Sequence, residues 1–515
     1  MLGTSLLITG CGDAPEQSSG AENNEYGNSI EAADDFYPDA HFDWAYPEAL
    51  SSWDPIESPS GNNIIFYKPV YDRLLHEGID GDVTPMLATE YTASEDGKTL
   101  TLQLREGLAF SDGEPFNADA VKFNLDRARG EGSTLSGELT QVTSVDVVDE
   151  YTVELKLSGQ IGPIPVTLSS RAGIMVSPAA AKSGTLATQP VGIGPYSVTQ
   201  YVPGDKAEYE KTPDYWDPDA QRVASMTYYA MPDDQTRLNA LKSGEIDAAR
   251  VNADQMDGLA TDNFTPLVQP SARYLYFMVN ASQEPFDNPE VRKALNMAID
   301  REAISQGLYD GYCTPQIHPF PETGPGYSKT IGDGLEEFPY DPEAAKKALE
   351  DAGVADLQIS TTTSNITSNT KLAEAIQEQL SGVGIDMTIK PVPTAEMVQA
   401  FVVDQSVEAI TSIATGINDP DVSNARYVKP DAYLNAGGTE YPDLNTYGDE
   451  GAASLNPRDR APFYEKYLES WIETPPHLIP ICMSHEASAY APNVSGVSQR
   501  TNGYSDLRGV SIAQE

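Results

Sequence analysis

The sequence is poor in cysteine and histidine. Its 515 residues include three cysteines, at positions 11, 313 and 482, and five histidines. None of them forms a CxxC pair or the Cys/His spacing of a zinc site, and three cysteines are too few for a disulfide framework. The sequence therefore predicts no metal centre, and nothing in it indicates a bound cofactor.

Positive charge is also scarce. The chain carries 78 Asp and Glu against 32 Lys and Arg, a formal net charge of −46. A field of this sign repels nucleic-acid phosphates and anionic lipid, so we expect no nucleic-acid partner. An acidic, solvated surface that keeps the protein in solution is the simplest interpretation, and attraction of cationic ligands is the alternative.

Catalytic motifs are missing as well. We find no GxSxG nucleophile turn, no GxxxxGK phosphate loop, no GxGxxG dinucleotide fingerprint and no HExxH metal pair. Paired carboxylates are frequent, but in so acidic a chain their pairing carries no information about acid–base chemistry. The sequence therefore favours a binding protein over an enzyme.

The N-terminus carries an address signal. Leu6–Ile8 is apolar, and the stretch that ends at Cys11 resembles a bacterial lipobox, in which the cysteine becomes lipid-modified. No Lys or Arg precedes the apolar run, and an ordinary hydrophobic N-terminus with a chance cysteine is the alternative. We expect residues 1–11 to be a signal peptide with its lipobox and residues 12–40 to be a flexible polar tether. No later segment has about 18 consecutive apolar residues, as a membrane-spanning helix requires.

The body of the chain alternates strand and helix patterns. Residues 99–104 and 151–157 alternate apolar and polar side chains, which predicts half-buried strands. Between them, Asn117 can cap a helix with an apolar stripe, and two later helices open with proline, at Pro289 and Pro342. A further helix and strand are expected at 369–380 and 385–389. Because one core rarely supports so long a chain, we expect several mixed α/β lobes.

Eight blocks follow one another along the body of the chain. They are YDRLL (71–75), DVTPMLA (82–88), SEDGKT (94–99), LREGLAFSDGEPFNADAVKF (104–123), VGIGPYSVTQY (191–201), PDYW (213–216), LKSGEID (241–247) and PFDNPEVRKALNMAIDREAI (285–304). In this order they resemble family 5 of bacterial extracellular solute-binding proteins, the peptide, nickel and opine binders of ABC importers. The resemblance runs from about residue 40 to the C-terminus.

The resemblance implies an α/β, periplasmic-binding-protein-like fold of two hinged lobes (class II, cluster C) with an extra domain. The ligand would be enclosed in a cleft between the lobes. A discontinuous domain I would comprise 41–55, 172–268 and 488–515, with domain II at 56–171 beside it. Domain III, the second lobe, would run over 269–487.

The resemblance also implies a function. The chain would be the substrate-binding lipoprotein of an ABC importer, capturing a di- or oligopeptide and delivering it to the permease and ATPase subunits. It would work outside the cytoplasm as a monomer, lipid-anchored to the bacterial cell membrane. Opine, oligosaccharide or metal-chelate ligands, and a regulatory lipoprotein that transports nothing, are the alternatives.

Candidate ligand residues lie first in the segment 418–421. In peptide-binding relatives a carboxylate of the matching segment holds the amino end of the peptide, and Asp419 takes that place here, flanked by Asn418 and Asp421. A turn before Pro420, or less readily a calcium site, would explain the same residues. Dipeptide-binding relatives place a basic residue before the helix at 369–380, whereas residues 364–369 are uncharged here.

Other candidates lie elsewhere in the chain. Trp44, Tyr46 and Trp53 could line the cleft or pack in the core of the first lobe. Arg426 could face a ligand carboxylate or form a surface salt bridge. Cys313 and Cys482 could pair in an oxidising compartment, provided that the fold brings them together.

Overall fold

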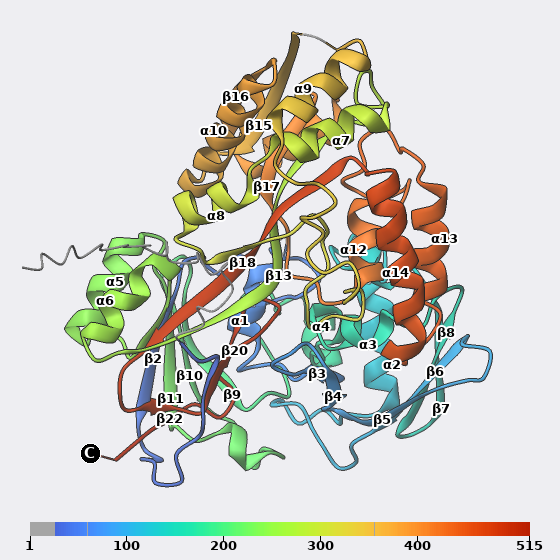
Figure 1. The fold of residues 1–515 in the computed structure, drawn as a ribbon. Helices are drawn as coiled ribbons and strands as arrows, with labels where there is room; N and C mark the ends of the chain where they lie inside the picture. The colour runs from blue at the N-terminus through green and yellow to red at the C-terminus, as the bar shows by residue number, and fades with distance from the viewer. Residues whose placement is uncertain (1–25, 59, 355, 515) are drawn as a thin grey trace, which may run out of the picture.

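The computed structural model describes residues 26–514 except 59 and 355. The largest sheet is mixed and has eleven strands, in the order β16-β15-β17-β13-β18-β12-β2-β11-β10-β9, with β14 paired to β18. Two long antiparallel strands in its middle, β13 (Thr265–Val279) and β18 (Leu478–Tyr490), run from one lobe into the other (Figure 1). The sheet therefore joins two lobes through one continuous strand pair.

The first lobe is built around three parallel strands, β2 (His41–Tyr46), β11 (Ser225–Ala230) and β12 (Ala248–Val251). Strands β10 (Lys206–Lys211) and β9 (Tyr196–Val202) extend it antiparallel. Helices α5 (Asp234–Ser243) and α6 (Met256–Thr261) lie at its outer end (Figure 1). The hydrophobic core of this lobe is rich in Tyr and Trp. Such large aromatic side chains bury much apolar area on folding.

Trp44 and Trp53 belong to this aromatic core. Both are fully buried, and Trp44 stacks on Tyr490 while Trp53 packs against Tyr67 and neighbouring tyrosines. Of their two interpretations, packing in the first lobe is therefore the arrangement found in the structure. The short helix α1 (Ile64–Tyr67) packs in the same core, although the expected boundaries placed it in the extra domain.

The second lobe has parallel strands β15 (Leu357–Ser364), β16 (Ile385–Val392) and β17 (Ala409–Ile413). Its helices are α7 (Pro289–Ala298), α8 (Arg301–Tyr309), α9 (Pro342–Asp351), α10 (Thr367–Gly382), α12 (Pro420–Tyr427), α13 (Pro442–Gly451) and α14 (Pro457–Glu473). The prolines at the start of α7 and α9 are confirmed as first-turn residues. Asn288 and Asp341 cap these two helices through their side chains.

The extra domain is a four-stranded sheet, β5 (Ala88–Ala93), β6 (Thr99–Leu104), β8 (Thr152–Leu157) and β7 (Val142–Asp149), in that spatial order. Helix α2 (Ala118–Ala128) packs on it, and the side chain of Asn117 accepts a bond from the Ala120 amide, as predicted. Figure 1 places this domain directly beside α12 and α14 of the second lobe. The extra domain is therefore inserted in the sequence between segments of the first lobe, and in space it also contacts the second lobe.

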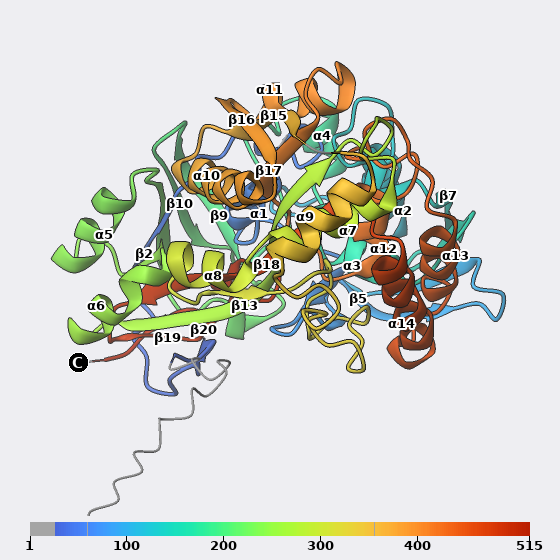
Figure 2. The ribbon, with the colours of Figure 1, turned by 45° about the horizontal axis from the view of Figure 1, so that its top comes forward.

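The two lobes meet where the β13–β18 ladder changes register. Residues 265–270 pair with 485–490 in the first lobe, and 274–278 pair with 478–483 in the second, with an irregularity between Pro270 and Tyr274. Figure 2, in which the top of the molecule is turned towards the viewer, again shows β13 and β18 side by side. Such a break bends a strand locally, so residues 271–273 form the natural hinge.

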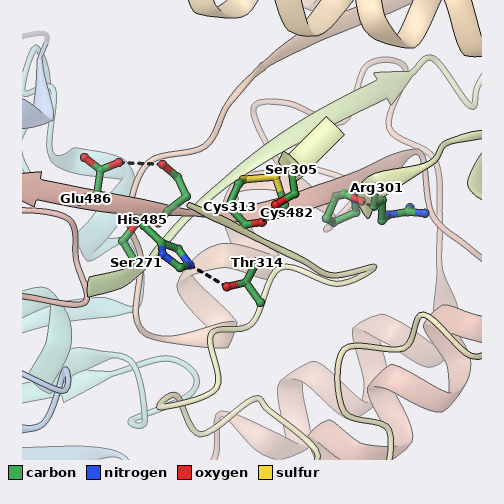
Figure 3. The surroundings of a disulfide bond; sticks show 10 residues. Ser271, Arg301, Ser305, Cys313, Thr314, Cys482, His485 and Glu486 are labelled. Carbon is green, nitrogen blue, oxygen red and sulfur yellow. Dashed lines mark hydrogen bonds between the residues drawn. A yellow bond between two sulfur atoms is a disulfide. The ribbon is translucent and has the colours of Figure 1, made fainter. Parts of the chain in front are cut away.

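A disulfide lies on the second-lobe side of this hinge. It joins Cys313 of β14 (Cys313–Pro315) to Cys482 of β18, with 5.4 Å between the Cα atoms. Figure 3 shows it beside the hinge residue Ser271 and the His485–Thr314 hydrogen bond of 2.7 Å. The bond fastens β14 to the strand that leads into the hinge.

We predict that replacing both bonded cysteines by serine destabilises the second lobe. The disulfide closes a separation of 169 residues, and removal of such a crosslink costs about 2–4 kcal/mol. Denaturant unfolding of the double variant measures this loss, and reduced wild-type protein is the control. Equal stability of oxidised wild type and variant would show that the bond adds nothing to the lobe.

Candidate ligand-binding site between the lobes

The carboxyl ends of the parallel strands in both lobes point to the hinge. In the second lobe, Ile413 at the end of β17 pairs with Leu275, just beyond the register break. In the first lobe, Val251 at the end of β12 pairs with Ala487, and β2 runs parallel to β12 and ends at Tyr46. Ligands of open α/β sheets bind outside the carboxyl ends of the strands. The junction at the hinge is therefore the place where both lobes can contact one ligand.

Glycines allow the two strand ends to meet closely. A Cβ on Gly416, three residues after β17, would lie 2.3 Å from the carbonyl oxygen of Asn502 and 3.0 Å from Cγ of Arg273. Gly503 has φ of +87°, and a Cβ there would lie 2.8 Å from Cδ of Arg273. Segments from each lobe thus pack against the stem of Arg273.

Arg273 is the cation at the centre of this junction. Its Nη1 lies 3.6 Å from Oε2 of Glu486, an oxygen that already binds the guanidinium of Arg250. Burial alone would lower the pKa of Arg273, but Glu486 and then Tyr504 raise it above its ordinary value. The guanidinium is therefore charged at any physiological pH and shares its carboxylate with a second arginine.

Two buried tyrosines of the first lobe, Tyr46 and Tyr504, also raise the pKa of Arg273 through their charge. Tyr46 is 5% exposed, and Tyr504 donates a hydrogen bond of 2.8 Å to Oδ1 of Asn62. Burial raises the pKa of Tyr46 well above its usual value and that of Tyr504 to about 12. Both hydroxyls therefore keep their protons and can donate hydrogen bonds.

Asn418 forms a bridge between the lobes. Its Nδ2 donates a 2.5 Å hydrogen bond to Oε1 of Glu77, whose Oε2 accepts one of 2.5 Å from Nδ2 of Asn502. Glu77 ends β3 (Leu75–Glu77), which pairs with β4 (Val83–Pro85) in a hairpin of the first-lobe side. Asn418 thus sits at the junction, where it holds the lobes together.

Both carboxylate oxygens of Asp419 have partners within the second lobe. Oδ1 accepts hydrogen bonds from the amides of Asp421 and Val422, which makes Asp419 the N-cap of α12. Oδ2 accepts a bond of 2.7 Å from Nη1 of Arg460, and the side chains are 1% and 5% exposed. Asp419 therefore caps α12, as the turn interpretation expects, and its second oxygen forms a buried ion pair with Arg460.

The remaining candidates lie around α12. Asp421 is buried, binds Nζ of Lys429 at 3.0 Å, and accepts a bond of 3.4 Å from Gln141 of the extra domain. Arg426 is exposed above the ring of Tyr427, and we find no ion pair for it within the described residues. The expected surface salt bridge of Arg426 is thus absent there.

Sequence reasoning missed Arg273. A signal was present, because Arg273 is the charged residue in the otherwise apolar run from Ala272 to Val279. A charge within a buried strand is costly unless it is paired or used. The run lies between the blocks 241–247 and 285–304, so no block that carries the family resemblance includes it.

Two other kinds of site find little support in the described part of the chain. A small cavity of about 30 Å³, lined by Lys68, Tyr196 and Arg508 among others, lies inside the first lobe and is too small for a peptide. No group of His, Cys, Asp and Glu side chains among the described residues could hold a metal ion. A search of the same residues for a helix long and apolar enough to cross a membrane finds none.

We predict that the Asp419–Arg460 pair acts on stability. Arg460→Met leaves an unpaired buried carboxylate, which costs about 3–5 kcal/mol, and a second change of Asp419 to Asn should recover part of that loss. Denaturant unfolding of the double-mutant cycle measures the coupling. Arg458→Met, an exposed change on the same helix, is the control. A stable Asp419→Asn variant that no longer binds ligand would instead assign Asp419 to the ligand.

Comparisons with known proteins agree with this fold. Residues 82–449 match the family described as bacterial extracellular solute-binding proteins, family 5 Middle. The glutathione-binding protein GsiB of Salmonella typhi is 33% identical over 348 residues, 66% of this chain and 67% of that protein. GsiB of Pectobacterium atrosepticum is 31% identical over 361 residues, 67% of this chain and 69% of that protein.

Solved structures show the same architecture. AgaA from A. tumefaciens R10, in complex with agropinic acid, has a TM-score of 0.80 at 24% identity and covers 92% of this chain and 99% of its own. DppA from Helicobacter pylori, in complex with the peptide STSA, has a TM-score of 0.78 at 23% identity and covers 93% and 99%. The fold is therefore that of class II periplasmic binding proteins. The protein belongs to family 5 of the bacterial extracellular solute-binding proteins.

Proposed function

We propose that this protein is the solute-binding component of an ABC importer and captures a short peptide between its two lobes. One observation carries the proposal: the carboxyl ends of the parallel strands of both lobes meet at one hinge, around Arg273. A ligand held there contacts both lobes at once. Delivery to a membrane permease then follows, because the closed form presents both lobes as one surface.

Closure can be described from contacts across the junction. The amide of Gly162 in the extra domain donates a 2.8 Å bond to the carbonyl of Ala452 in the second lobe, and Asn418 donates to Glu77. These hydrogen bonds join the second lobe to the first-lobe side in the structure. A ligand that binds the closed form better shifts the population towards it by its difference in affinity for the two forms.

The relatives guide the choice of ligand. The GsiB proteins are named for glutathione, a small acidic peptide, while structural neighbours hold a peptide or agropinic acid. Residues 364–369 are uncharged, so this chain lacks the basic residue that dipeptide-binding relatives place there. This difference argues against tight recognition of dipeptides in the same manner. We therefore propose a short peptide that is bound through other residues. Opines, oligosaccharides and metal chelates are the alternative ligands. A regulatory lipoprotein that binds no solute is the alternative function.

Location, assembly and domain boundaries belong to the same proposal. We infer a monomer without enzymatic activity that works outside the cytoplasm, anchored through lipid on Cys11 and tethered by the residues that directly follow it. Cys11 and residues 12–25 lie outside the described residues. The expectation of a flexible tether was wrong for 26–40, because β1 (Ser29–Ile30) in this stretch pairs with β20 (Val497–Gln499). Domain I would comprise 41–55, 172–268 and 488–515, domain III 269–487, and the cores support moving 64–71 from domain II to domain I.

The test is thermal unfolding of a form lacking residues 1–11 against glutathione, short peptides, opines, oligosaccharides and metal chelates. A ligand at about 100 times its Kd stabilises the protein by about 2.7 kcal/mol, which raises Tm by a few degrees in a chain of this size. A shift with peptides supports the proposal. A shift confined to opines or sugars keeps the importer and replaces the ligand, and no shift with any compound favours the regulatory alternative.

A further inference from the structure

The backbone on both sides of the Arg273 side chain is held in place. Oγ of Ser271 donates a 2.8 Å bond to the carbonyl of Ser484, and the Ala272 amide donates one of 2.6 Å to the carbonyl of Thr501. The Arg273 amide donates to Oγ of Ser271 at 3.2 Å. Figure 3 shows Ser271 and Glu486 on the neighbouring segments that meet here. A side chain on so constrained a backbone is well placed to fix the orientation of a ligand.

The guanidinium itself is hardly used. Arginine carries a planar fork of several N–H donors, yet we find no hydrogen bond from this side chain within the described residues. Its 3.6 Å approach to Glu486 exceeds hydrogen-bond length, and the shared oxygen is already bound by Arg250. The Arg273 side chain remains 20% exposed. Its donors are therefore free to bind a second anion.

The neighbouring groups fit an anion with two planar oxygens. Tyr46 lies at the carboxyl end of β2 and makes no hydrogen bond through its hydroxyl in the described part of the chain. The nearest acids are Glu486, held by Arg250 and Ser484, and Glu48, held by Ser60 and Asn62. Both carboxylates thus have hydrogen-bond partners other than Arg273, while the arginine fork and the Tyr46 hydroxyl have none in the described part of the chain.

We propose that Arg273 and Tyr46 bind a carboxylate of the imported solute, so that the ligand is an acidic small molecule such as a peptide with a free carboxyl end. The inference rests on the proposed solute-binding function and names its ligand class. The two carboxylate oxygens accept from the guanidinium, and the Tyr46 hydroxyl donates a third bond. Gly416 of the second lobe and Gly503 of the first lobe pack against the stem of the arginine, which places its side chain at the junction.

The test compares matched probes on matched variants. Glutathione and a tripeptide mixture with free carboxyl ends are measured against the same compounds with every carboxyl group amidated. The proteins are wild type, Arg273→Met, Arg273→Lys and Arg426→Met, each checked for native secondary structure. Wild type and Arg426→Met should bind the free acids at least about 30-fold more tightly than the amides, because a charge-assisted forked pair is lost on amidation. Arg273→Met should lose this preference, and Arg273→Lys should retain part of it because it keeps the charge without the fork.

Two outcomes would overturn the inference in distinguishable ways. If Arg273→Met binds the free acids as wild type does, or wild type prefers amides, solute binding stands and the carboxylate site is wrong. If wild type binds neither these probes nor opines, sugars or chelates, the proposed function fails and the inference fails with it.

Discussion

The antiparallel pair β13–β18 is the constraint on which the rest of the molecule depends. It is hydrogen-bonded over most of its length, so it fixes the order of the strands in both lobes, yet its register breaks at 271–273. Because β12 and β17 pair with it on opposite sides of the break, the carboxyl ends of both parallel sets face the same point. A single strand pair thus creates both the hinge and the meeting place of the lobes.

Buried charge around the junction divides into structural and available groups. Asp419 and Arg460 neutralise each other inside the second lobe, and Glu77 is consumed by amides from both lobes. Arg273 differs, because its carboxylate partner is shared with Arg250 and its donors are not filled. In a chain of net charge −46, an incompletely paired arginine at the junction is the feature on which the proposed preference for an anionic ligand rests.

Much of the fold could be predicted from the sequence, and the reasons are local. Asn117, Asn288 and Asp341 cap helices because side-chain oxygens satisfy free amides of the first turn, and period two marks β6 and β8. The family-like blocks added the lobed architecture. The packing of α1 in the first lobe instead of the extra domain depends on long-range contacts that no local pattern contains.

The site was harder to predict because its chemistry depends on partners distant in sequence. The sequence around Asp419 does not reveal that Arg460, 41 residues further on, binds one of its oxygens. Trp44 and Trp53 have the same composition signal whether they line a cleft or fill a core, and burial alone decides between the two. The sequence marks Arg273 as a charge in an apolar run, but its place at the junction depends on Gly416 and Gly503, which are distant in sequence.

The central claim, that the lobes move about β13–β18 and close on a ligand, is tested most directly by a distance between them. Spin labels are attached to cysteines placed at the exposed positions Glu245 in the first lobe and Lys371 on α10. Double electron–electron resonance then measures the distance between the two labels. The account predicts a broad distribution with longer distances without ligand and a narrow, shorter one with the best ligand of the panel. One narrow distribution, unchanged by that ligand, would contradict it.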